Sequence, residues 1–173
     1  MGRSLSRWGA HPTMATKTAQ EWYAEYGAYH KNPTNKLIHW ICIPAIMTAL
    51  VGLLWSLPVP WGSAAPWLNW AMVVAAASLL FYLRLSLPLA IGMAAWLAVT
   101  LGIVWVVELA TGQPVWIASL ALFVVAWIGQ FIGHAIEGQK PAFFKDLQFL
   151  LIGPAWLLDD ASKRLLNRTP TSS

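Results

Sequence analysis

One stretch of the chain, residues 37–136, is almost free of charge. The chain has 11 Lys and Arg and 7 Asp and Glu residues, and only Arg84 and Glu108 fall within these hundred positions. Charged residues make up 10% of the chain, whereas a water-soluble domain has about 25%. A stretch this apolar cannot cover its own surface in water, which excludes a soluble enzyme, a disordered chain and a coiled coil. The sequence therefore predicts an integral membrane protein.

Four apolar runs within this stretch predict four transmembrane helices. They lie at about residues 37–57, 67–83, 89–107 and 115–136 and are bounded by prolines, glycines or charges. Lys and Arg occur before the first run, between the second and third, and after the fourth, but not in the connections 58–66 and 109–114. By the positive-inside rule both termini are then cytoplasmic. The predicted fold is an all-α membrane bundle in contact with the lipid bilayer, and the net charge of +4 marks topology rather than a nucleic-acid partner.

The segments that flank the four runs have the pattern of interfacial amphipathic helices. At the N-terminal side, Thr18 and Glu21 form a possible capping box before a helix with an aromatic face that includes Trp22 and Tyr26. Residues 17–166 are expected to form one membrane-embedded domain. Residues 1–16 and 167–173 are expected to be tails, with either Met1 or Met14 as the start of the chain.

At the C-terminal side, a segment that begins at Pro141 is expected to be interrupted at Gly153 and Pro154. Residues 143–158 are either interfacial or re-entrant. Residues 155–166 are expected to form a short amphipathic helix, because acidic and basic residues are spaced four apart in it. The pairs are Asp159 with Lys163 and Asp160 with Arg164.

Three histidines are expected to meet near the cytoplasmic interface. Asn32 and Pro33 predict the N-cap and first residue of the first membrane helix, so His30 directly precedes that helix and His39 lies about two turns into it. His134 lies near the end of the fourth run, which returns to the same interface. Buried polar groups in a membrane are costly and are candidates for function. Polar residues accompany the histidines at helical spacing: Asn35, Gln130 and Glu137.

Three neutral imidazoles suit a single iron, zinc or copper ion, and a site of this kind with open coordination positions activates oxygen or water. Two alternatives remain open on the residues alone. One is an electron carrier in which His39 and His134 bind a b-type haem axially. The other is a non-catalytic lipid-binding membrane protein in which the histidines form a polar plug.

Two segments resemble the signature stretches of a known family. These are YHKNPTNKLIH at 29–39, followed by Ile43-Pro44, and QFIGHAIE at 130–137, followed by Pro141-Ala142. They are similar to the two motifs of the membrane 2-hydroxy fatty acid dioxygenases (Mpo-like), small multi-span proteins that include the fungal enzyme of phytosphingosine degradation. The resemblance covers roughly residues 18–154, and between the motifs only the hydropathy matches.

The resemblance implies an Fe(II)-dependent enzyme that uses O2 for the α-oxidation of a long-chain 2-hydroxy fatty acid to the acid one carbon shorter. It implies that His30, His39 and His134 bind the metal. Glu137 is expected to support the site through hydrogen bonds, with a role as fourth ligand as the alternative. Candidate substrate contacts are Asn35, Lys36, Gln130 and Tyr29.

We expect the substrate head to chelate the iron at the cytoplasmic interface while the acyl tail lies between helices or in the lipid. The site is expected to face the cytoplasm from a bacterial inner membrane or, in a eukaryote, from the endoplasmic reticulum. The oligomeric state is left open.

Overall fold

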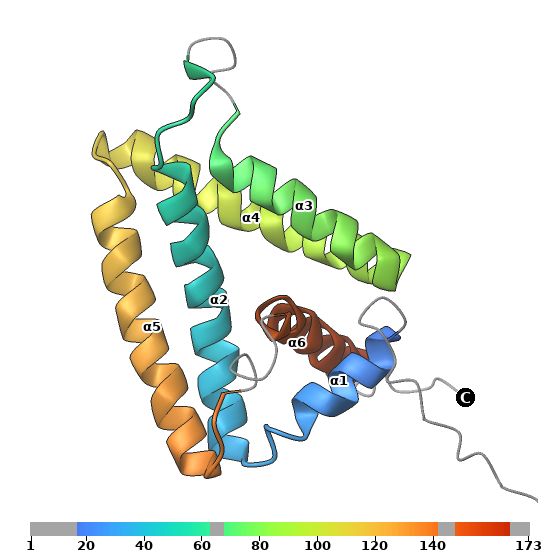
Figure 1. Cartoon of the computed structure of the whole chain (residues 1–173). Coiled ribbons are helices and arrows are strands. Elements are labelled where there is room, and N and C mark those ends of the chain that lie inside the picture. Colours follow the sequence, from blue (N-terminus) through green and yellow to red (C-terminus); the bar gives the residue numbers. More distant parts are fainter. Residues whose placement is uncertain (1–16, 63–67, 142–147, 167–173) are drawn as a thin grey trace, which may run out of the picture.

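The computed structural model describes residues 17–62, 68–141 and 148–166, and these residues form six α-helices and no strand (Figure 1). The all-α prediction is therefore confirmed for the described part of the chain, and the two expected tails lie outside it. The helices are α1 (Ala19–Gly27), α2 (Pro33–Trp55), α3 (Trp70–Leu85), α4 (Leu87–Thr111), α5 (Trp116–Glu137) and α6 (Phe149–Leu166).

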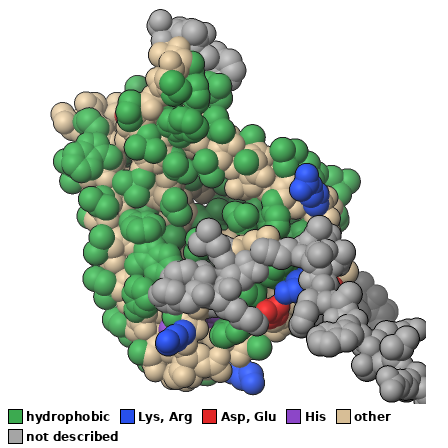
Figure 2. Space-filling model, in the orientation of Figure 1, with side chains coloured by type: hydrophobic (Ala, Val, Ile, Leu, Met, Phe, Trp, Pro, Cys, Tyr) green, Lys and Arg blue, Asp and Glu red, His purple; other side chains and the backbone are tan. Residues whose placement is uncertain are grey.

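Three of the helices are long and apolar enough to cross a membrane. These are α2, α4 and α5, with 23, 25 and 22 residues. The second predicted span corresponds to α3, which has 16 residues and so extends about 24 Å, less than a hydrocarbon core of about 30 Å. The surface agrees with a lipid environment, because most of the visible face over the long helices is hydrophobic and the charged side chains gather toward one end and one edge (Figure 2).

The helices α2 and α5 lie side by side along most of their length (Figure 1). Two glycines of α5, spaced four residues apart, allow this approach. A side chain at Gly129 would bring its Cβ to 2.6 Å from the Cys42 sulfur, and one at Gly133 would collide with the Asn35 side chain. Small residues at this spacing let membrane helices pack closely. The contact brings the N-terminal part of α2 against the C-terminal part of α5.

Both predicted helix starts are confirmed. The Thr18 hydroxyl accepts the Glu21 amide hydrogen, and the Glu21 carboxylate accepts the Thr18 amide hydrogen at 2.7 Å, which completes a capping box before α1. Asn32 caps α2 by accepting the Thr34 amide hydrogen at 2.9 Å, with Pro33 at the first helical position. The Asn32 cap therefore marks the end of the short connection between α1 and α2.

The aromatic face of α1 is covered by protein in the structure. Trp22 and Tyr26 are buried, and both pack against Phe149 of α6, with ring centroids 5.4 and 5.9 Å apart. Tyr26 also packs against Trp156 of α6. The face that was expected at the membrane surface is therefore the contact between α1 and α6.

The predicted interruption at Gly153 and Pro154 is wrong, because α6 runs through both residues. Proline removes one helical hydrogen bond, here the one to the Leu150 carbonyl in the first turn of α6, and the rest of the helix is intact. The part of the expected segment at residues 142–147 lies outside the described residues.

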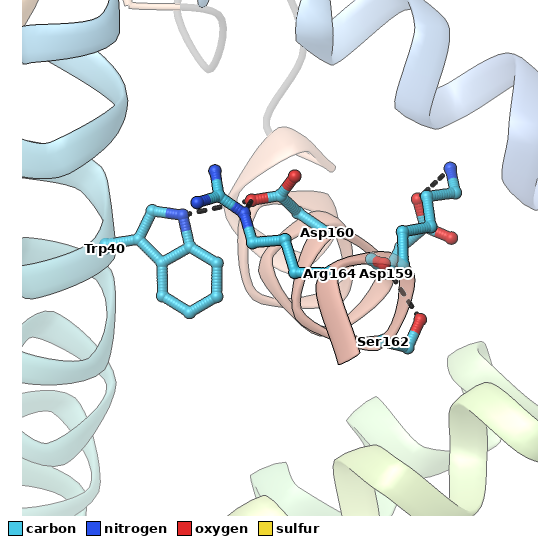
Figure 3. A network of polar contacts seen from close by, with 6 residues as sticks. Trp40, Asp159, Asp160, Ser162 and Arg164 are labelled. Atoms are coloured by element: carbon cyan, nitrogen blue, oxygen red, sulfur yellow. Dashed lines mark hydrogen bonds and ion pairs between the residues drawn. The ribbon is translucent and has the colours of Figure 1, made fainter. Parts of the chain in front are cut away.

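The predicted charge pairs of α6 are confirmed. Lys163 contacts Asp159 at 2.6 Å and Arg164 contacts Asp160 at 2.9 Å. Asp160 also accepts the Trp40 indole hydrogen at 3.2 Å, which joins α6 to α2 (Figure 3). This contact helps hold α6 beside the N-terminal half of α2.

Candidate metal centre

His30 and His39 are oriented by the backbone. His30 lies in the connection before α2, and His39 lies on α2. The Nδ1 of His30 is 2.7 Å from the Tyr26 carbonyl oxygen, and the Nδ1 of His39 is 2.9 Å from the Asn35 carbonyl oxygen. A carbonyl can only accept a hydrogen bond, so each Nδ1 must carry the hydrogen. In the neutral rings this leaves a lone pair on each Nε2.

These two lone pairs face each other. The Nε2 atoms of His30 and His39 are 2.9 Å apart. A hydrogen placed between them would make one ring an imidazolium, and burial opposes that charge because both side chains are 1% exposed. Imidazole nitrogens bind Zn²⁺ at about 2.1 Å, so two of them at a right angle stand about 3 Å apart. The spacing of this pair therefore fits two ligands of one metal ion.

His134 of α5 completes the group. Its ring centroid is 5.1 Å from that of His30 and 4.9 Å from that of His39. Each of the three residues offers a ligand nitrogen within 4.8 Å of the others. His134 is 5% exposed, and its buried Nδ1 has no hydrogen-bond partner among the described residues. The convergence expected of the three histidines is present, and metal binding by them remains a prediction.

The environment of His30 favours its neutral form. The pKa of His30 is lowered to about 4, mainly by burial. The hydrogen bond to the Tyr26 carbonyl raises the pKa, and the nearby His134 lowers it. Tyr26 also stacks on the His30 ring, with centroids 4.2 Å apart and planes at 20°. Metal binding requires a neutral imidazole, so His30 is ready to act as a ligand at neutral pH without losing a proton.

Glu137, the last residue of α5, connects that helix to the segment that carries His30. One carboxylate oxygen accepts the Lys31 amide hydrogen at 2.8 Å. The other accepts the Asn32 amide hydrogen at 2.9 Å and the Asn35 side-chain amide at 3.0 Å. The hydrogen bonds of Glu137 thus hold the backbone and amide groups around the histidines.

A cavity of about 310 Å³ opens beside the histidines, between α2, α5 and α6. His39, His134 and Gln130 contribute to its wall. The rest of the wall is almost entirely apolar, and its members include Ile43, Ile46, Met47, Leu50, Phe123, Trp127, Phe149 and Leu150. An apolar cavity with a few convergent polar groups at one end has the chemistry of a ligand site.

The four candidate substrate contacts lie in different places. Gln130 lines the cavity, and its buried Oε1 has no hydrogen-bond partner among the described residues. Asn35 is buried between α2 and Gly133 of α5 and binds Glu137. Lys36 lines a separate surface pocket that includes Trp40, and Tyr29 packs against Phe149. Neither Lys36 nor Tyr29 contributes to the cavity wall.

One aromatic residue and two glycines of the site were not anticipated from the sequence. The Trp156 ring lies 5.7 Å from the His30 ring, and Tyr26, which belongs to the predicted aromatic face of α1, stacks on His30 and lines the cavity. Gly129 and Gly133 permit the close contact that brings His134 toward His39. The spacing of these two glycines is a signal for close packing of membrane helices and would have indicated which faces of α2 and α5 meet.

Comparisons with known proteins show the family of the chain. A family model described as "2-hydroxy-palmitic acid dioxygenase Mpo1-like" matches residues 16–165. The chain is 30% identical over 138 residues to the 2-hydroxy-palmitic acid dioxygenase MPO1 of Saccharomyces cerevisiae, a match that covers 77% of this chain and 73% of the yeast protein. No solved structure matches the chain. The resemblance inferred from the two motifs is confirmed, and the chain belongs to the Mpo1-like family.

Proposed function

We propose that this protein is an Fe(II)-dependent dioxygenase that performs α-oxidation of long-chain 2-hydroxy fatty acids. The observation that carries the proposal is a buried group of three histidines, with two lone pairs facing each other at 2.9 Å, beside an apolar cavity. The reaction converts R-CH(OH)-COOH and O2 to R-COOH, CO2 and H2O. It removes four electrons from the substrate, and one O2 accepts all four, so no separate reductant is required.

His30, His39 and His134 would hold the iron. When bound there, iron supplies open coordination positions and the redox chemistry that O2 activation requires. Gln130 has a buried, unpartnered Oε1 at the same end of the cavity, so it is the candidate acceptor for the hydrogen of the substrate 2-hydroxyl. The apolar wall excludes water and takes the acyl chain.

Glu137 and Asn35 are proposed as positioning residues. Their mutual hydrogen bond and the bonds of Glu137 to the Lys31 and Asn32 amides keep the connection before α2 in place. His30 directly precedes Lys31 and Asn32. A shift of these two residues would therefore move His30 relative to the other two proposed ligands. Lys36 lies near the cytoplasmic end of α2 and would attract the carboxylate during approach.

The proposed orientation has four spans, with both termini and the site on the cytoplasmic side. The supporting pattern is the confinement of Lys and Arg to one side of the apolar runs. In this orientation the polar head of the substrate enters from the interface and the chain stays in the apolar interior. The membrane would be the inner membrane of a bacterium or the endoplasmic reticulum of a eukaryote.

Anaerobic reconstitution with Fe(II), followed by O2 and 2-hydroxyhexadecanoic acid, tests the proposal. We expect uptake of O2 and formation of pentadecanoic acid and CO2 in equal amounts. The three variants His30→Ala, His39→Ala and His134→Ala should lose this activity, whereas His11→Ala, which changes the fourth histidine of the chain, should keep it. Full activity in one of the three variants would remove that residue from the proposed ligand set.

The same preparation separates the alternatives. A haem bound by His39 and His134 would have to lie between rings whose centroids are 4.9 Å apart and edge to face, and nothing in this packing favours it. A Soret band in the purified protein would nevertheless overturn the dioxygenase proposal. If protein purified without a His-tag or chelators binds no transition metal in stoichiometric amount, the lipid-binding alternative takes its place.

A further inference from the structure

A second apolar cavity lies next to the first and shares part of its wall. It has a volume of about 320 Å³ and lies between α2, α3, α4 and α6. Four residues contribute to the walls of both cavities: Met47 and Leu50 of α2, and Leu150 and Pro154 of α6. The side chains of these four residues, at the middle of α2 and the first turns of α6, therefore lie between the two cavities.

The wall of the second cavity offers nothing to a polar ligand. Its two hydroxyl groups already donate hydrogen bonds to backbone carbonyls, Ser78 to Val74 and Tyr82 to Leu151, both at 2.8 Å. The remaining members of the wall are aliphatic or small, and no charged side chain is among the residues that line it. A hydrocarbon chain is the ligand that this wall can stabilise, through burial of apolar surface.

The two cavities together follow α2 over more than the depth of one lipid leaflet. The first is lined by α2 residues from His39 to Leu50, which extend about 17 Å at 1.5 Å per residue. The second continues to Leu54, which brings the total to about 23 Å. One leaflet contributes about 15 Å to a hydrocarbon core of about 30 Å. A chain of ordinary membrane length fits the first cavity, and a longer one needs the second.

We propose that the second cavity is the binding site for the distal carbons of a very-long-chain 2-hydroxy fatty acid. The chain passes from the histidines through the first cavity, crosses between Met47 and Leu150, and ends between α3 and α4. The proposal rests on the proposed dioxygenase function and extends it, because it assigns selectivity for chain length to α3. Ala75 of α3, which is 8% exposed and lines the second cavity, is the residue at which added volume would shorten the site.

Substitution of Ala75 tests the assignment, with Ala77 as the matched control on the exposed face of the same helix. In Ala75→Phe we expect kcat/KM to fall at least about tenfold for 2-hydroxytetracosanoic acid, because even one methylene matters in an apolar pocket. For 2-hydroxydodecanoic acid, which ends in the first cavity, kcat/KM should stay within about twofold. Ala77→Phe should leave both values unchanged. Equal loss for both acids in a folded Ala75→Phe protein, or no loss for either, overturns the proposal.

A second measurement does not depend on the folding of a variant or on turnover. The unchanged protein is irradiated with 2-hydroxy acids that carry a diazirine on the last carbon, and the labelled residues are mapped by mass spectrometry. The tetracosanoic probe should label Val74, Ser78 or Leu97, and the dodecanoic probe should label Ile46 or Phe123. Labelling of outward residues such as Val125 by the long probe overturns the proposal. If no acid is turned over but the labels follow this pattern, the dioxygenase function fails and the cavity assignment stands.

Discussion

The two ends of the α2–α5 pair each include a carboxylate that accepts N–H groups, but they differ in how many buried polar atoms have no hydrogen-bond partner in the described part of the chain. Each end has a carboxylate near the border of the apolar region, Glu137 on α5 and Glu108 on α4. At the end without histidines, Glu108 accepts the Trp55 indole hydrogen at 2.7 Å, and Ser119 of α5 fits against Gly52 of α2. Both carboxylates accept N–H groups and join separate helical segments.

The two ends differ in the buried polar atoms that have no hydrogen-bond partner. At the histidine end, three buried polar atoms have no hydrogen-bond partner among the described residues: Asn35 Oδ1, Gln130 Oε1 and His134 Nδ1. Folded proteins rarely leave such atoms unpaired, and each exception needs an explanation. One end is therefore a structural contact with its polar groups paired, whereas the other keeps unpaired polar atoms, as the proposed ligand site would require.

The largest effect is expected for His39→Ala, which tests whether the histidine end binds a metal. Removal of one of the two facing Nε2 atoms should abolish stoichiometric metal binding. We expect activity to fall by more than about a hundredfold, which exceeds the loss seen when a residue that hydrogen-bonds to a metal ligand is changed. The measurement is metal content by mass spectrometry together with O2 uptake. Thr100→Ala on α4 is the control, because Thr100 is equally buried at 2% exposure but bonds only to its own helix. If His39→Ala keeps its full metal content, His39 is not a ligand and the facing pair of histidines is only a polar contact.

Substitution of the two carboxylates compares the ends directly. Glu137→Gln replaces one acceptor oxygen by an NH2 group, which would face the hydrogens of the Lys31 or Asn32 amides. We expect about a tenfold to hundredfold loss of metal affinity, as is usual for residues that orient ligands. Glu108→Gln should leave metal affinity and kcat unchanged. The measurements are Fe(II) titration and steady-state kinetics on both variants. An equal loss of metal affinity in Glu137→Gln and Glu108→Gln would contradict the distinction between the ends.

Gly133→Ala tests whether close packing of α5 on α2 positions His134. The added Cβ collides with the Asn35 side chain, so either that side chain or the two helices must shift next to the histidines. Overpacking of this kind costs about 1–3 kcal/mol, and we expect a severalfold rise in the dissociation constant for the metal. Gly102→Ala on α4 adds the same methyl group to open space. A loss of thermal stability without a change in metal affinity would mean that this contact supports the fold but not the site.

The long apolar helices, their caps and the meeting of three histidines follow from local patterns. Hydropathy and the Asn32-Pro33 pair mark where α2 begins, and the return of the fourth run to its starting side brings His134 to the level of His39. The helices and their caps depend on residues that are near one another in sequence, so they were predictable. The meeting of the histidines was predictable because it depends only on the number and direction of the apolar runs.

The remaining features depend on which faces of the helices meet. Pro154 suggested a break, but it costs α6 one hydrogen bond near its start, and burial of the helix against α1 and α2 outweighs that loss. The aromatic face of α1 suggested a membrane surface, because an apolar stripe looks the same whether lipid or α6 covers it. A supporting role for Glu137 was predicted, but its partners, the Lys31 and Asn32 amides, follow only from the contact of α5 with the segment before α2.

The smallest expected effects come from a pair of tryptophans, one at each end of α2. Trp55→Phe removes the hydrogen bond to Glu108, and Trp40→Phe removes the one to Asp160 of α6. Each should lower stability by about 1 kcal/mol, the net value of one hydrogen bond, as measured by thermal unfolding in detergent. Only Trp40→Phe should also raise KM, because α6 forms a wall of both cavities and loosens when that contact is lost. The two indoles make the same kind of hydrogen bond, each to a carboxylate, at opposite ends of α2. An equal rise of KM in Trp55→Phe would therefore mean that the end without histidines also affects the site.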